Sequence, residues 1–182
     1  MTLIALVLCS VTLQKGFAQE SPSAGEVKLY RYGELLRAHG VELKEPSLVN
    51  ALKNRDASVR YLAAMQLAED KAVDAIPAIE QALAVEKESR ARVNIALALA
   101  LLGDKAGNTE LDAICSNKTF VPEFRLYAVR YMFDLHSAKD ENCLNAAEQI
   151  IESQNASIGD RTSALELIAR FQGLTSDELR RV

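Results

Sequence analysis

The sequence predicts an all-α protein, a right-handed α-solenoid of about four helical hairpins. Hydrophobic residues make up 49% of the chain but aromatic residues only 5%, and much of the apolar content is Ala and Leu, which favour helix. Four Pro and eight Gly in 182 residues argue against a low-complexity or all-β chain. A helical pattern also recurs every 32 to 36 residues, and such a period is typical of repeat architectures.

The chain begins with an apolar segment, "MTLIALVLCSVTL". This segment is shorter than the roughly 20 residues of a membrane-spanning helix, and it is followed by Gly16 and Ala18, where a signal peptidase requires small residues. We expect residues 1–18 to be a signal peptide cleaved near Ala18. The mature chain is then periplasmic or extracellular and does not insert into a membrane. The alternatives are a buried N-terminal helix and, less favoured, a lipoprotein anchor at Cys9. The absence of Lys and Arg before the apolar stretch leaves open a true start upstream of Met1.

A linker and a capping helix separate this segment from the repeats. Residues 19–25, "QESPSAG", are polar and contain Pro and Gly, which indicates a flexible linker. Residues 26–45 contain apolar residues at helical spacing up to Gly40, so we expect an atypical N-terminal capping helix there. Pro46 opens the periodic part, and residues 46–182 are expected to form one repeat domain.

Four segments of the repeat domain align on an arginine. These arginines are Arg60, Arg92, Arg125 and Arg161, at spacings of 32, 33 and 36 residues. Shorter helical segments lie beside them: "PSLVNALKN", "AIPAIEQALAVE", "NTELDAICS" and "NCLNAAEQIIES". Each pair of segments predicts a helical hairpin. One hairpin cannot bury its apolar face alone, so stacking the hairpins gives a continuous core.

Small residues on the arginine segments predict close packing between helices, and larger apolar residues predict the layer that fills the space between them. The small residues are Ala63, Ala64, Ala96, Ala98, Ala128 and Ala164, and the larger ones are Leu67, Leu99, Met132 and Ile168.

The residues Asp56, Val59-Arg60 and Ala63-Ala64, together with "VNIALALALLGD" at 93–104, give the chain a family resemblance. Over roughly 46–172 it resembles the HEAT repeat, in the short bacterial form also seen in bilin-lyase-like proteins. The third and fourth repeats depart from the pattern, with Phe124 and Asp160 where Val usually precedes Arg. The resemblance implies an α-solenoid that binds a protein partner on its concave face, as an exported scaffold. A bilin-lyase-like enzyme and an accessory module of a larger envelope assembly are the alternatives.

Composition and motifs give no support to several other functions. The formal net charge is −4, whereas a nucleic-acid binder needs a concentrated basic surface. No Ser-His-Asp set and no Gly-rich phosphate loop is visible, so we expect no catalytic residues and no cofactor. The cluster of His136, Asp140, Glu141 and Cys143 matches no metal-ligand signature, and we expect no metal.

The four repeat arginines are expected to be structural. Acidic residues close by in sequence can pair with them, namely Asp56, Glu88, Glu123 and Asp160. The alternative is a track of arginines that binds an anion.

Two cysteines remain after removal of the signal peptide, Cys115 and Cys143. If their helices stack in parallel, the two Cα atoms are offset by roughly 7 Å along the axis and by about 8–10 Å laterally. A disulfide requires a Cα separation below about 7 Å. We therefore expect two free thiols.

The third arginine segment carries the candidate binding patch. Tyr127 and Tyr131 lie one helical turn apart, with Arg130 and Asp134 nearby, and in HEAT proteins the arginine-bearing helix lines the concave surface. Tyr and Arg dominate binding hot spots, so we expect both rings to be substantially exposed and to contact a partner. The alternative is that the two rings only fill the core.

Overall fold

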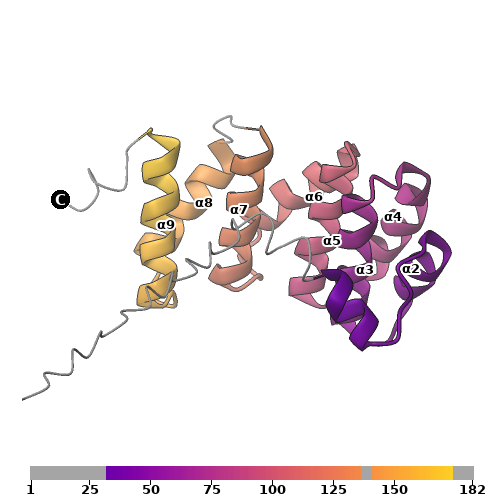
Figure 1. Ribbon diagram of the computed structural model, residues 1–182. Coiled ribbons are helices and arrows are strands. Elements are labelled where there is room, and N and C mark those ends of the chain that lie inside the picture. The colour runs from indigo at the N-terminus through magenta and orange to yellow at the C-terminus, as the bar shows by residue number, and fades with distance from the viewer. Residues whose placement is uncertain (1–31, 137–140, 174–182) are drawn as a thin grey trace, which may run out of the picture.

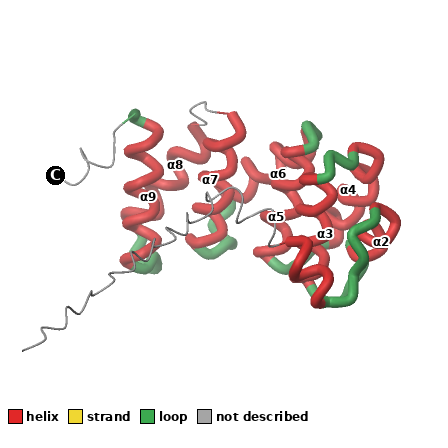
Figure 2. Tube along the Cα trace, in the orientation of Figure 1, coloured by secondary structure: helices red, strands yellow, loops and turns green. Residues whose placement is uncertain are grey.

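A computed structural model describes residues 32–136 and 141–173 of the chain. The expected signal peptide (1–18), the linker (19–25) and residues 174–182 lie outside the described residues. Every regular element in the described part is a helix (Figure 2), which confirms the all-α class there. A search of these helices finds none with the length and apolar character that crossing a bilayer requires.

The helices after residue 45 overlap the segments expected from the sequence. Of the expected capping helix at 26–45, residues 26–31 lie outside the described residues, residues 32–38 are helical, and residues 39–44 are not. The elements that follow are α2 (Glu45–Ala51), α3 (Ala57–Glu69), the short 3-10 helix η1 (Val73–Ala75), α4 (Ile76–Val85), α5 (Ser89–Leu101), α6 (Lys105–Ser116), α7 (Pro122–His136), α8 (Glu141–Glu152) and α9 (Ile158–Phe171).

Polar side chains fix where these helices begin. Asp56, Glu88 and Asp104 each accept a hydrogen bond from a backbone N–H in the first turn of α3, α5 and α6. Ser157 forms a capping box with Asp160 at the start of α9. Such caps satisfy N–H groups that have no partner within the helix. Helix boundaries were therefore predictable from the sequence, because the capping residues are local to the helices that they start.

Four helices form a row, which we call the odd row. It consists of α3, α5, α7 and α9, and each of these helices contacts the next one. Each of α5, α6, α7 and α8 also contacts the helix that follows it in sequence, and α6 contacts α8. Figure 1 shows the elements following one another across the molecule from α2 to α9. These sequential contacts are consistent with helical hairpins.

Small residues line the contacts of the odd row. The expected alanines Ala63, Ala64, Ala96, Ala98, Ala128 and Ala164 are all fully buried. Leu67 and Leu99 are also fully buried, while Ile168 is only partly buried. A fully buried Leu side chain contributes about 1.5–3 kcal/mol, so the larger residues supply most of the hydrophobic stabilisation while the alanines allow the close approach.

Gly107 sets the closest approach between α5 and α6. A Cβ at this position would overlap Ala100 N and Ala96 O, which are backbone atoms of α5. Backbone atoms cannot move aside as a flexible side chain can, so the position requires glycine.

Candidate functional site

Arg60 of α3 contacts two other segments, the end of α4 and the loop that precedes α3. Its Nε and Nη2 each donate a 2.7 Å hydrogen bond to the carboxylate of Glu86. Its Nη1 donates to the carbonyls of Asn54 and Arg55, at 2.8 and 3.0 Å. The Glu86 side chain is only 1% exposed, so this pair is shielded from water on the carboxylate side.

Arg92 and Arg125 repeat part of this arrangement. Arg92 donates from Nε to Glu110 at 2.6 Å and from Nη1 to the Glu86 carbonyl at 3.0 Å. Arg125 donates from Nε to the Cys115 carbonyl at 2.8 Å. Its Nη2 is buried without a hydrogen-bond partner among the described residues, and burial lowers the pKa of this guanidinium.

The three arginines thus share one kind of contact, a hydrogen bond to a carbonyl at or just after the C-terminal end of the preceding short helix. Carbonyls at a helix end lack partners within the helix, and cations stabilise that end. The expected carboxylate partners differ from the observed ones: Asp56, Glu88 and Asp160 cap helices, whereas Glu86 and Glu110 pair with the arginines. Within the described ranges Arg161 forms no ion pair. The structural role of the four arginines stays a prediction that mutagenesis can test.

The prediction that Cys115 and Cys143 are free thiols is wrong. The two cysteines form a disulfide with a Cα–Cα separation of 5.1 Å, and both are fully buried. The prediction assumed that α6 and α8 pack in parallel, with no shift along the helix axis between equivalent residues. Instead the last turn of α6 meets the first turn of α8, which removes the expected offset. Disulfides are typical of proteins that reside in an oxidising compartment.

The expectation that Tyr127 and Tyr131 are both substantially exposed is not met. Both rings are half-buried and pack against the core, with their centroids 6.5 Å apart in a stacked arrangement. Burial raises the pKa of Tyr131 to about 12, and its hydroxyl forms a long hydrogen bond of 3.5 Å to Asn94 of α5. Tyr131 therefore connects α7 to α5 and is a packing residue first.

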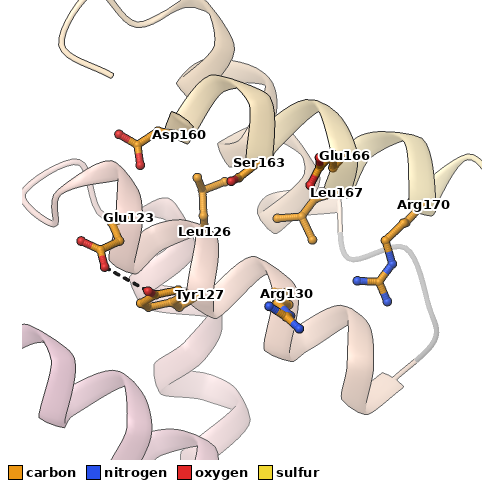
Figure 3. Close-up of a pocket in the computed structure, with 9 residues that line it drawn as sticks. All are labelled: Glu123, Leu126, Tyr127, Arg130, Asp160, Ser163, Glu166, Leu167 and Arg170. Atoms are coloured by element: carbon orange, nitrogen blue, oxygen red, sulfur yellow. Dashed lines mark hydrogen bonds between the residues drawn. The ribbon is translucent and has the colours of Figure 1, made fainter. Parts of the chain in front are cut away.

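Tyr127 lies in a different environment, at a groove between α7 and α9. Its hydroxyl donates a 3.0 Å hydrogen bond to Glu123, and this bond raises the pKa of Tyr127. Figure 3 shows its ring near Leu126, toward the Glu123 end of the groove. The groove has a volume of about 360 Å³, and its lining residues come from both helices: Glu123, Leu126, Tyr127 and Arg130 of α7, and Asp160, Ser163, Glu166, Leu167 and Arg170 of α9.

Two arginines meet at one end of this groove. Arg170 donates a 3.1 Å hydrogen bond to Asp134, and Arg130 approaches the same carboxylate at 3.7 Å. The Arg170 guanidinium also lies 4.9 Å from the centre of the Phe133 ring, which packs edge-on against Phe171 at 4.6 Å. Two cations therefore share one carboxylate, and one of them is held over an aromatic face.

The structure brings Tyr127 and Arg130 of the expected patch into the groove, with Asp134 at its edge, and it directs Tyr131 toward α5. Sequence reasoning missed the α9 half, above all Arg170 and Leu167. One signal was the spacing of the sequence: Arg125 and Arg161 are 36 residues apart, as are Asp134 and Arg170. Asp134 of α7 and Arg170 of α9 carry opposite charges and form an ion pair.

No known family matches this chain, and no characterised protein is significantly similar to it. In the part of the chain that the structure describes, no three His, Cys, Asp or Glu residues lie together as a metal site would require.

Proposed function

We propose that this chain is an exported, non-enzymatic scaffold that binds a protein partner. In this proposal the helices form a right-handed, HEAT-like α-solenoid whose odd row lines the concave face. The α7–α9 groove of that row receives the partner.

The observation that carries the proposal is the composition of the α7–α9 groove. It combines an aromatic side chain, Tyr127, with two arginines, Arg130 and Arg170, above a floor formed by Leu126 and Leu167. Tyr and Arg beside a desolvated apolar floor are the residue types that dominate protein-binding hot spots. The groove is lined from two adjacent helices of the row, as expected for a ligand that lies along a stack of repeats.

Two independent features support export. The apolar N-terminal segment with Gly16 and Ala18 fits a signal peptide. The buried Cys115–Cys143 disulfide fits an oxidising environment outside the cytoplasm. An exported chain without a catalytic constellation is expected to act through binding.

Filling the groove tests this function. Ser163 is exposed on the α9 side of the groove, so Ser163→Trp should block it, whereas Glu148→Trp places the same side chain on the exposed surface of α8. Both mature variants are used as baits, beside the wild type, in quantitative affinity capture from the cells that produce the protein. We expect specific partners to be retained by the wild type and Glu148→Trp and lost by Ser163→Trp. Equal capture by all three would contradict the proposal.

A further inference from the structure

We propose that Arg130 and Arg170 form a carboxylate-binding subsite, so that the partner presents an acidic peptide segment to the α7–α9 groove. This inference rests on the proposed function and deepens it, because it names the chemical class of the segment that is recognised.

Arg130 and Arg170 have more hydrogen-bond donors than the acceptors that they contact. Arg130 and Arg170 share a single carboxylate, that of Asp134. Arg170 uses one N–H group on it, and the side chain of Arg130 makes no hydrogen bond to any residue in the described ranges. Each guanidinium has five N–H donors. Most of them therefore remain available, in the planar geometry that binds a carboxylate through two bonds.

The Arg170 side chain is held in place before a ligand arrives. The Phe133 ring lies beneath its guanidinium, and Phe171 supports that ring from the side. A cation over an aromatic face is attracted by the quadrupole of the ring. Less conformational freedom is then lost when a ligand binds, which favours affinity.

The groove offers guanidinium donors at one end only. Figure 3 shows Arg130 and Arg170 at one end, and Glu123 and Asp160 at the other. Asp160 is occupied by the capping box with Ser157, and Glu123 accepts from Tyr127. Glu166 of α9 lies at the arginine end, one helical turn before Arg170. A carboxylate ligand therefore finds guanidinium N–H donors only at the arginine end, beside the apolar floor, where it competes with Asp134 and Glu166.

The charges around the groove do not themselves favour an acidic ligand. The chain carries a formal net charge of −4, so general electrostatic attraction favours basic ligands. Arg170 also lies in the last turn of α9, where the helix dipole repels anions. Binding of an acidic segment must consequently come from the two guanidinium groups.

Three acetylated tetrapeptides test the subsite by NMR titration of the mature protein. One is Ala-Leu-Ala-Glu with an amidated C-terminus, which has only a side-chain carboxylate. The second is Ala-Leu-Ala-Gln with a free C-terminus, which has only a terminal carboxylate. The third is Ala-Leu-Ala-Gln with an amidated C-terminus, which has none. The first two distinguish an internal acidic residue from a chain end.

At least one carboxylate peptide should bind about tenfold more tightly than the uncharged one, with shifts at the C-terminal ends of α7 and α9. This preference should disappear in Arg130→Gln/Arg170→Gln and persist in Arg37→Gln, an exposed arginine of the helical residues 32–38. Asp134→Asn retains both guanidinium groups and removes their shared carboxylate, so it should tighten carboxylate binding severalfold.

Equal binding of all three peptides, or no binding of any of them, would overturn the subsite. So would a preference that survives in the double variant, or weaker carboxylate binding in Asp134→Asn. None of these results decides the scaffold function, which depends on the comparison of Ser163→Trp with Glu148→Trp. Loss of partner capture in Ser163→Trp together with full capture in Arg130→Gln/Arg170→Gln would leave the scaffold in place and remove the acidic segment.

Discussion

Arg60 of α3 and Glu86 at the end of α4 form a pair with two hydrogen bonds of 2.7 Å. The Glu86 carboxylate also accepts from the backbone N–H groups of Lys87 and Glu88. This single carboxylate therefore connects α3 to the segment that leads into α5, where Glu88 caps the helix. Its four donors compensate for its removal from water.

Replacing Arg60 with Ala should destabilise the fold. The change leaves Glu86 buried with only its two backbone donors, and hydrogen bonds to charged groups contribute about 1.5–3 kcal/mol. Chemical denaturation followed by circular dichroism measures the loss, with Arg37→Ala as the exposed control. An unchanged unfolding free energy, together with loss of an anion-binding activity, would favour the anion-track alternative.

The stability of the fold should depend on Glu86 in acid. Burial raises the pKa of Glu86, but the hydrogen bonds from Arg60, Glu88 and Lys87 outweigh it, so the pKa lies below its ordinary value of 4.5. The unfolded chain then takes up the proton first as the pH falls, so the contribution is complete above pH 4.5 and is lost as the pH falls through the lowered pKa. The unfolding free energy of the wild type, measured by chemical denaturation, should fall as the pH is lowered over this range. Glu86→Gln should lack that part of the pH dependence, and identical acid profiles for both proteins would refute the assignment.

The Cys115–Cys143 bond should contribute substantially to stability. It closes a loop with a sequence separation of 28 residues, for which the loop-entropy relation gives about 3–4 kcal/mol. Cys115→Ser/Cys143→Ser should therefore lower the unfolding free energy by a comparable amount. Thiol labelling of the denatured, unreduced mature protein should find neither cysteine reactive, and detection of two thiols would restore the original expectation.

The two tyrosines should respond differently to truncation. Tyr131→Ala removes a ring that packs against the core, and removal of a large buried side chain costs about 3–5 kcal/mol at full burial, so a clear drop in melting temperature is expected. Tyr127→Ala should lower the melting temperature less than Tyr131→Ala does. It should weaken partner binding more. The phenol of Tyr131 should titrate near 12 in an ultraviolet pH titration, and a value near that of free tyrosine would show that the ring is exposed.

Much of the fold could be predicted because its determinants are local. Asp56 caps α3 and Asp104 caps α6 within two residues of the N–H groups that they bind, so the helix boundaries follow from the sequence. The contacts between successive helices are consistent with the hairpins that the repeat period predicts. The all-α class and the buried alanines follow from the same local pattern.

The remaining features depend on how helices shift against one another. The disulfide forms because the last turn of α6 meets the first turn of α8, and no local pattern gives that displacement. The pairing of Arg60 with Glu86, rather than with Asp56, depends on the fold in the same way. The α9 half of the groove was missed because its residues become neighbours of Arg130 only after packing.

Photo-crosslinking by position tests the central claim, partner binding in the α7–α9 groove, most directly. A photoreactive amino acid replaces either Ser163 in the groove or Glu148 on α8, and both proteins are irradiated in the cells that produce them. The account predicts discrete protein adducts from Ser163, none of them formed from Glu148, and a lower yield of these adducts when Tyr127→Ala is added. Adducts that are the same from both positions, or absent from Ser163, would contradict it.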